Sequence, residues 1–335
     1  MQPHLKLKKL VVKICLHQDT FDYIMHKFPN LECCNVNLSF SEAFQNHIES
    51  WMTRHYEEKL WAFHKYLSSR RCDWFFTFGS FPLIEKHLQD TTNPVVRISV
   101  IDTQTQLHIQ QDNITWIMAN TKENTDKLTE LFKKYQHVVK EACMKTSGNH
   151  ETDLLLRALI LECKGLEKLT YEKPTISVPL INFPVSYQIL NSSLIMLKLI
   201  VLELQPEVLT AYSYGFPELR NLIIKVINPG VEAGLFVIDM PYTIFNHLQV
   251  HIDSYSFYVC RNKLEAFGKP RLLEIVSRKS GLQRFLIDCT ASNQIEEFTT
   301  NKEYNHKLVI NCVSIDFLSV SIHYRHVLKK CPLFL

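Results

Sequence analysis

Residues 216–224 read Phe-Pro-Glu-Leu-Arg-Asn-Leu-Ile-Ile and join a helix-stopping proline to an alternating apolar segment. Pro217 has no backbone N–H to extend a helix, so a preceding helix has to end before it. Leu219, Leu222 and Ile224 then follow the spacing L-x-x-L-x-L, whose last part has the two-residue period of a half-buried strand. The stretch therefore predicts a helix, a turn and a strand in that order.

The same spacing recurs along the chain. Counted from its first apolar residue, it begins at Leu7, Leu31, Leu166, Leu194, Leu219, Phe245 and Leu282. The first two starts lie 24 residues apart, and those from Leu166 onward lie 28, 25, 26 and 37 apart. A period of about 20 to 29 residues is typical of leucine-rich repeats, and the 37 indicates an insertion. The chain is therefore predicted to be an α/β leucine-rich-repeat solenoid, a horseshoe with parallel strands on its concave face and helices on its convex face.

The predicted organisation is a single array over residues 1–335 with an irregular or inserted middle region at 40–165. Weaker repeat starts in that region are Val95 and Ile114. Its other patterns are helical at 41–67 and 123–144 and strand-like at 74–78 and 95–101. Outside the middle region, helical patterns that end near a proline cover 21–28, 208–216 and 323–330, and looser echoes of the proline step occur at 81–84 and 269–272.

Composition indicates a globular protein. Apolar residues make up 46% of the 335 residues, as in chains that bury a core. Glycine occurs 8 times, far below the usual frequency, so Gly-rich phosphate-binding loops are not expected. The net charge of +3 is near neutral, which argues against a dedicated nucleic-acid surface. Nucleic acid is therefore not an expected partner.

The chain is predicted to be intracellular, in the cytoplasm or the nucleus. Its ten cysteines include no C-x-x-C pair and are interpreted as reduced, mostly buried thiols. Lys13 interrupts the N-terminal apolar run far short of a signal-peptide core. The most apolar segment, residues 193–204, contains Lys198 and Glu203 and is about half the ~20 residues of a membrane span. It is interpreted as a buried strand, so no membrane partner is expected.

Residues 22–31 and 211–222 resemble the leucine-rich-repeat portion of fungal F-box proteins, of the ribonuclease-inhibitor-like type. In that family an N-terminal F-box docks a Skp1-type adaptor of a cullin ubiquitin ligase, and the repeat array holds the substrate. The resemblance implies a substrate receptor of this kind. The chain departs from the family because its first repeat begins at Leu7, leaving no room for an F-box. It is expected to be a fragment or truncated product, or a repeat protein without the adaptor module.

The repeat also predicts which side chains face a partner. Side chains alternate along a strand, so the positions between the apolar ones should lie on the concave face. The predicted binding residues are Lys9, Lys13, Asn35, Met196, Lys198, Ile200, Asn221, Ile223, Lys225, His247, Gln249, His251 and Arg284. With Lys168 and Asp288 included, six basic residues face one acidic residue, which predicts an acidic protein partner. The alternative is that a solvated strand face is simply rich in lysine.

Apolar residues also fall on the predicted concave face. They are Met196, Ile200, Ile223 and Leu286, and an apolar centre within a charged rim is the mixture found in binding patches. The alternative is that a loop or a partner subunit covers them. The predicted function is therefore protein–protein recognition, as the substrate-binding part of an F-box-like ubiquitin-ligase receptor. A structural scaffold without a ubiquitin role, or an enzyme on an unrelated α/β fold, is the alternative.

Motifs of common enzyme classes are missing. The sequence contains no G-x-S-x-G, G-x-x-x-x-G-K-[ST], G-x-G-x-x-G or H-E-x-x-H, so no catalytic residue, cofactor or metal site is predicted. His247 and His251 have the i, i+4 spacing of helical zinc ligands, but on a strand they lie about 13 Å apart. Cys33 and Cys34 are adjacent and should point to opposite sides of a strand. The aromatic residues between Trp51 and Tyr66 are interpreted as core.

Overall fold

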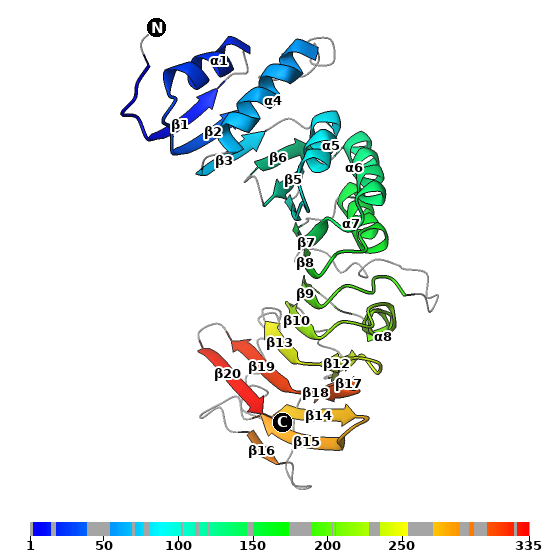
Figure 1. Cartoon of the computed structure of the whole chain (residues 1–335). Coiled ribbons are helices and arrows are strands. Elements are labelled where there is room, and N and C mark those ends of the chain that lie inside the picture. Colours follow the sequence, from blue (N-terminus) through cyan, green and yellow to red (C-terminus); the bar gives the residue numbers. More distant parts are fainter. Residues whose placement is uncertain are drawn as a thin grey trace. The chain divides into compact units, whose positions relative to one another are not determined.

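The computed structural model divides the chain into two compact units, Met1–Lys140 (unit 1) and Glu141–Leu335 (unit 2). Both are mixed α/β, with strands that pair mostly in parallel and helices packed on the sheet (Figure 1). The structure describes residues 3–14, 18–38, 54–68, 71–76, 81–101, 103–110, 114–119, 121–145, 150–173, 189–202, 204, 206–227, 235–253, 271–287, 295–297, 307–324 and 327–334. The predicted α/β class with parallel strands is thus confirmed.

Unit 1 begins with three strand-and-helix steps and then turns into a meander. Its elements are β1 (Lys9–Ile14), α1 (Gln18–Lys27), β2 (Cys33–Leu38), α4 (Arg54–Ser68), β3 (Arg71–Phe76), α5 (Phe81–Asp90), β4 (Val96–Ile101), β5 (Gln104–Ile109), β6 (Ile114–Ala119) and α6 (Lys122–Lys134). The strand order is β1-β2-β3-β6-β5-β4. The first three pairs are parallel, whereas β5 is antiparallel to both β6 and β4.

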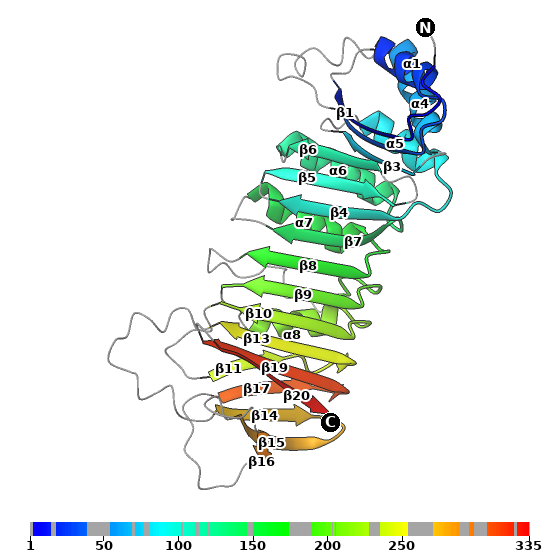
Figure 2. The same cartoon turned by 90° about the vertical axis from the view of Figure 1, so that its left-hand side faces the viewer.

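Unit 2 contains the main sheet, whose described strands have the order β7-β8-β9-β10-β13-β19-β20. Its elements are β7 (Val139–Lys145, which begins at the unit boundary), α7 (His150–Glu162), β8 (Lys168–Lys173), β9 (Met196–Val201), α8 (Pro206–Gly215), β10 (Asn221–Val226), β13 (His247–Asp253), β19 (Phe317–Tyr324) and β20 (Val327–Phe334). Neighbouring strands from β7 to β19 are parallel, and β20 is antiparallel to β19. Figure 2 shows this sheet with α7 and α8 behind it.

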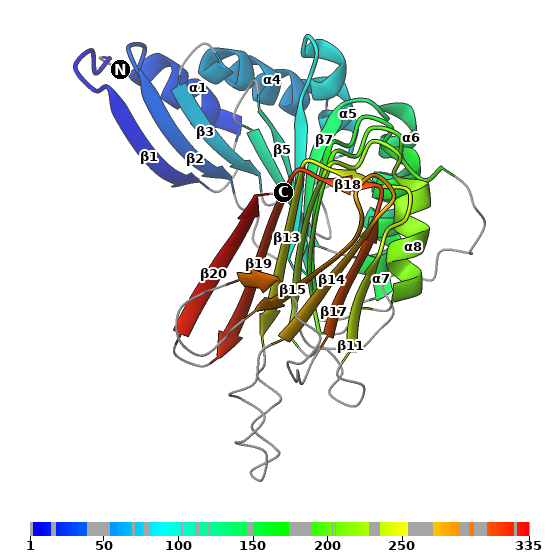
Figure 3. The ribbon, with the colours of Figure 1, turned by 90° about the horizontal axis from the view of Figure 1, so that it is seen from below.

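A second sheet lies beside the main one in unit 2, with the strand order β11-β17-β14-β15-β16. Its strands are β11 (Leu235–Asp239), β14 (Arg271–Ser277), β15 (Gly281–Ile287), β16 (Ile295–Glu297) and β17 (Lys307–Cys312), and the short strands β12 (Ile244–Phe245) and β18 (Ser314–Ile315) pair with each other. Figure 3 shows β11 and β17 on the same side of the main sheet as α8. After α8, strands therefore take the place of helices in the covering layer.

One turn recurs where helical segments pass into strands. The N–H of Phe216 closes the last turn of α8 on the carbonyl of Tyr212, and the N–H of Leu219 then donates to the carbonyl of Phe216 at 3.1 Å. β10 begins two residues later. The same three-residue step joins Phe28 to Leu31, Tyr135 to Val138 and Cys163 to Leu166. The predicted helix stops at Pro29 and Pro217 are thus confirmed.

The core of unit 2 lies between the main sheet and its covering layer. Leu197, Leu222 and Leu248 occupy equivalent positions on β9, β10 and β13, and each is at most 1% exposed. Helices α7 and α8 bury Leu155, Leu159, Leu209 and Tyr212. Burial of one such leucine stabilises a protein by roughly 1.5 to 3 kcal/mol, so this repeated apolar layer holds sheet and helices together.

Helix α8 is fastened to the second sheet by polar side chains. The hydroxyl of Thr210 donates to Asp239 Oδ2 at 2.6 Å, and the amide of Asn311 donates to Asp239 Oδ1 at 2.6 Å. The hydroxyls of Ser213 and Thr243 lie 2.9 Å apart and are both buried. Buried polar groups are costly unless hydrogen-bonded, so these contacts fix the position of α8 against β11 and β17.

Several sequence-based assignments are corrected. Residues 323–330 lie largely in β19 and β20 instead of a helix, and the helix predicted at 123–144 ends at Lys134, so that 139–145 forms β7. Pro82 lies in the first turn of α5 and does not stop a helix. Leu282 belongs to β15, which is antiparallel to β14 in the second sheet, and therefore does not begin a repeat of the main sheet. Short strands and helices share apolar spacings, which is why these segments were ambiguous.

Other assignments agree with the structure or fall outside it. Strands cover most of 95–101 and the described part of 74–78, and the described part of 41–67 forms α4. Residues 41–53, 77–78 and 269–270 lie outside the described residues. The segment 193–204 contains β9, as predicted. Among the helices that the structure describes, none combines the length and the hydropathy that crossing a membrane requires.

Asn191 links the ends of two helical segments in unit 2. Its amide donates to the carbonyls of Ile160 at 3.2 Å and Cys163 at 2.7 Å, and its side-chain oxygen accepts from the N–H of Ser193. Its own N–H donates to the carbonyl of Gly215. The residue is 1% exposed, so solvent does not replace these bonds if they are lost.

We therefore expect Asn191→Ala to lower the free energy of unfolding by about 2 to 4 kcal/mol, because it removes the buried side-chain donor to the carbonyls of Ile160 and Cys163 and the acceptor of the Ser193 N–H. Urea unfolding followed by circular dichroism measures the change. Asn246→Ala is the control, because Asn246 is exposed and its replacement should change stability by less than about 0.5 kcal/mol. Equal losses for the two variants would contradict the structural role of Asn191.

Gly215 ends α8 against Leu190. A Cβ atom at this position would lie 2.6 Å from both Cγ and Cδ1 of Leu190, closer than carbon atoms approach in folded proteins. We expect Gly215→Ala to lower the free energy of unfolding by about 1 to 3 kcal/mol through this overlap. Adding Leu190→Ala removes the overlap, so the loss in the double variant should be smaller than the sum of the single losses. Additive losses in urea unfolding would disprove the contact.

Candidate functional site

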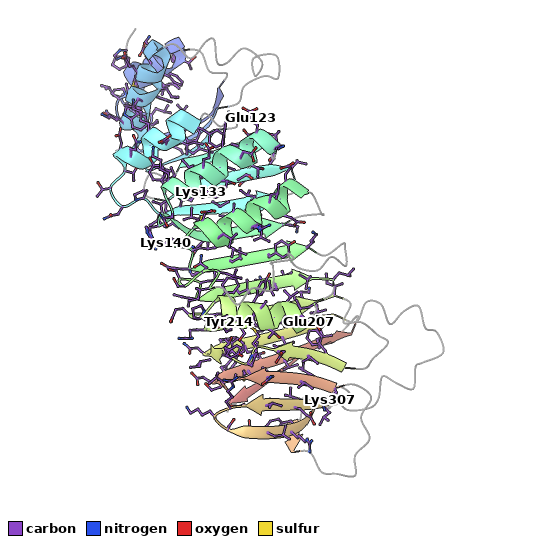
Figure 4. The ribbon with its side chains drawn as sticks, turned by 90° about the vertical axis from the view of Figure 1, so that its right-hand side faces the viewer. Glu123, Lys133, Lys140, Glu207, Tyr214 and Lys307 are labelled. Carbon is purple, nitrogen blue, oxygen red and sulfur yellow. The ribbon has the colours of Figure 1, made fainter. Side chains whose placement is uncertain are left out.

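The surface of the main sheet opposite α7 and α8 carries three side-chain rows, which we call the open face. It is the near side of the sheet in Figure 2 and the far side in Figure 4. On β8, β9 and β10 the described positions alternate between buried and partly exposed, so these rows are the side of each strand that does not enter the core. The open face is composed of residues 141, 143 and 145 on β7, 168, 170 and 172 on β8, 196, 198 and 200 on β9, 221, 223 and 225 on β10, and 247, 249 and 251 on β13.

The register of the five strands aligns these residues. Across the sheet, the first row is Glu141, Lys168, Met196, Asn221 and His247, the middle row is Cys143, Thr170, Lys198, Ile223 and Gln249, and the third row is Lys145, Glu172, Ile200, Lys225 and His251. Neighbouring strands lie about 4.8 Å apart, so the rows span about 19 Å. The open face is therefore wide enough for a segment of another protein.

Nine of the predicted binding residues meet on the open face. They are Met196, Lys198, Ile200, Asn221, Ile223, Lys225, His247, Gln249 and His251. Lys9, Lys13 and Asn35 belong to β1 and β2 of unit 1, where Asn35 pairs with Val11, midway between the two lysines. Lys9 is exposed, and the side chains of Lys13 and Asn35 lie outside the described ones.

Arg284 is not on the open face, which corrects its predicted placement. It lies on β15 of the second sheet, opposite Glu274, and its Nε donates to Glu274 Oε1 at 2.8 Å. Lys307 forms a second ion pair with the same carboxylate. Burial disfavours the charged form of Glu274, but the hydrogen bonds from Lys307 and Arg284 outweigh it and lower the pKa of this carboxyl. Arg284 therefore helps to join three strands. Of the other residues predicted beside it, Leu286 has a side chain outside the described ones, and Asp288 lies outside the described residues.

The charges of the open face are partly paired. Lys168 Nζ lies 2.8 Å from Glu141 Oε1, and Lys145 Nζ lies 3.2 Å from Glu172 Oε1. The sequence pattern did not reveal Glu141, because Ala142 and Met144 stand at the apolar positions of β7 in place of branched residues. It did not include Glu172, because the repeat pattern that begins at Leu166 was followed only as far as Tyr171. The excess of basic residues on this face is thus smaller than predicted and is confined to β9 and β10.

The centre of the open face is apolar around one lysine. Met196 and Ile200 flank Lys198 on β9, and Ile223 lies opposite it on β10. All four side chains are partly exposed. No described carboxylate lies within ion-pair distance of Lys198. An apolar centre with a polar rim is the arrangement found in the cores of protein interfaces.

The other residues considered from the sequence are two histidines, two adjacent cysteines and an aromatic helix. His247 and His251 are on a strand, as predicted, and the ring of His247 packs on Phe317 with centroids 4.7 Å apart. Among the described residues, no group of three or more His, Cys, Asp or Glu side chains is placed to hold a metal ion. Phe63 is buried against Phe21, with ring centroids 4.9 Å apart, so the core interpretation of this aromatic helix is confirmed there. Cys33 and Cys34 begin β2, and their side chains lie outside the described ones.

The described cysteines differ in exposure. Cys163 and Cys312 are buried, and burial raises the pKa of Cys312 to about 11. Cys143 is exposed in the middle row of the open face. Partial burial and the nearby Glu172 raise its pKa, against the opposing effect of Lys198 and Lys145. The reactivity of the Cys143 thiol is therefore a measure of how accessible the open face is.

Comparison of the chain with protein families, with curated proteins and with solved structures finds no match.

We expect iodoacetamide at pH 8.5 to modify Cys143 in the native protein, whereas Cys163 and Cys312 should react only after unfolding. Because its pKa is raised, Cys143 should react more slowly than a cysteine in a short peptide, since the thiolate is the reactive form. Peptide mapping by mass spectrometry gives the three rates. Equal modification of all three thiols in the native chain would contradict the placement of β7.

Proposed function

We propose that the open face is a protein-binding surface, and that the repeating units form a leucine-rich-repeat solenoid in which this face is concave. The observation that carries the proposal is the in-register alignment of three rows over five parallel strands, with apolar side chains exposed at their centre. All-parallel sheets are normally covered on both faces. The described side chains of the open face are partly or fully exposed, so they are available to a partner. The solenoid is supported by the recurring turn and by spacings of 25 to 28 residues between paired strands.

We further propose that the chain recognises substrates in the manner of an F-box-like ubiquitin-ligase receptor. Support for this role comes from the resemblance of residues 22–31 and 211–222 to that family, and both segments contain the recurring turn. A Skp1-type adaptor would not use the open face, because in the family it binds a separate module. Substrate and adaptor binding therefore respond differently to a change in the open face.

Replacing Ile223 by aspartate tests the binding surface. Ile223→Asp places a charge at the apolar centre of the open face without entering the core, because Ile223 is partly exposed. Tagged wild-type and variant chains are incubated with cell extract, and captured proteins are quantified by mass spectrometry. We expect at least one protein captured by the wild type to fall by about tenfold or more with Ile223→Asp, as for a central interface residue.

Ile244→Asp is the matched control, because Ile244 is 41% exposed and lies outside the three rows. It should capture the same proteins as the wild type. Binding of the captured protein should also slow the alkylation of Cys143. Unchanged capture by Ile223→Asp would disprove the proposed surface. A Skp1-type adaptor retained by all three chains would support the ligase role, and its absence would favour a scaffold without a ubiquitin role.

A further inference from the structure

We infer that the partner of the open face presents an acidic segment, and that Lys198 binds one of its carboxylates. This inference rests on the proposed function, because it specifies the chemistry of the partner at the same surface. It depends on the distribution of charge and of apolar side chains over the five strands.

The open-face lysines of β7 and β8 are already paired with carboxylates of the sheet. Lys168 is paired with Glu141 at 2.8 Å, and Lys145 is paired with Glu172 at 3.2 Å. A carboxylate from a partner would have to compete with these neighbours. Lys198, in the middle row, faces Thr170 on one side and Ile223 on the other, and no described carboxylate lies within ion-pair distance of it. Its charge is therefore available to a partner.

The open-face positions of β9, β10 and β13 contain no Asp or Glu. The nine side chains there are Met196, Lys198, Ile200, Asn221, Ile223, Lys225, His247, Gln249 and His251. The nearest acidic residue along these strands is Asp253, two residues beyond the third-row His251 on β13. A partner that lies over these three strands thus meets cationic, neutral polar and apolar groups. An acidic segment with apolar side chains complements this surface in both respects.

The surroundings of Lys198 strengthen an ion pair made there. Met196, Ile200 and Ile223 adjoin it on β9 and β10, and a bound partner would cover all of them. Apolar groups around a charged contact exclude water, so loss of one partner of such an ion pair leaves the other charge buried and unpaired and costs more affinity than loss of a solvent-exposed pair. Exposed pairs contribute little to affinity, so a lysine in this setting is distinguishable from its neighbours by mutation.

Selection from a random peptide library tests the inference with a defined probe. Phage that display random 12-residue peptides are selected on the purified full chain, and enriched sequences are compared with the input library. We expect the Asp and Glu content of enriched peptides to exceed that of the input by about twofold, with apolar residues beside the acids. On Lys198→Glu the excess should disappear. On Lys133→Glu it should persist, because Lys133 is exposed on α6 in unit 1 (Figure 4) and the change in net charge is the same.

A synthetic copy of the most enriched acidic peptide then compares two neutralised lysines. Fluorescence anisotropy should show about a tenfold loss of affinity for Lys198→Gln and less than about a twofold loss for Lys168→Gln, although each removes one positive charge from the same face. Circular dichroism confirms that both variants are folded.

Enriched peptides without an acidic excess, equal losses for the two variants, or no enrichment on the wild type would overturn the inference. The capture experiment with Ile223→Asp tests the proposed function separately. If Ile223→Asp loses a captured protein while the peptides are not acidic, the open face binds a partner of different chemistry and only the inference fails. If capture is also independent of Ile223, both fail.

Discussion

The hydrogen bond of the recurring turn, at the end of a helical segment, determines which side chains of the following strand face the core. At Leu219 the N–H binds the carbonyl of Phe216, and two residues later β10 joins a parallel ladder with β9 and β13. A slip of one residue would exchange the core-facing Leu222 with the outward Ile223 and reverse the two faces of the strand. The N–H groups of Val138 and Leu166 make the same bond just before β7 and β8, so the composition of the open face depends on where the preceding helical segments end.

The parts of the fold that could be predicted are those with a strong local signal. Pro217 and the apolar triplet that begins at Leu219 act within nine residues, so helix end, strand and side-chain direction follow from one short stretch. The strand β7 was not recognised because Ala142 and Met144 replace branched apolar residues at its inward positions. The position of Glu141 on the open face was therefore not predicted, and neither was its ion pair with Lys168.

Two further differences come from contacts distant in the sequence. Ile315, Leu318 and Val320 have the repeat spacing. The strands of the second sheet lie between them and β13 in the sequence, so the distance to the previous repeat start at Phe245 is too long to show a period. Leu282 has the same spacing, yet it belongs to a hairpin with β14. A strand alternates in the same way in parallel and antiparallel sheets, and the choice between them depends on partners that the local pattern does not contain.

The junction of β13 with β19 differs from the other parallel pairs in its sequence separation. Leu248 pairs with Leu318, 70 residues away, whereas Leu222 pairs with Leu248 at a distance of 26. The entropy of closing a loop grows with the logarithm of its length, so the longer connection costs roughly 0.9 kcal/mol more before any contact forms. Strands β7 to β13 can assemble through near neighbours in the chain, and pairs of high sequence separation form slowly. The end of the main sheet that contains β19 and β20 is therefore expected to close last during folding, after the open face has already been built.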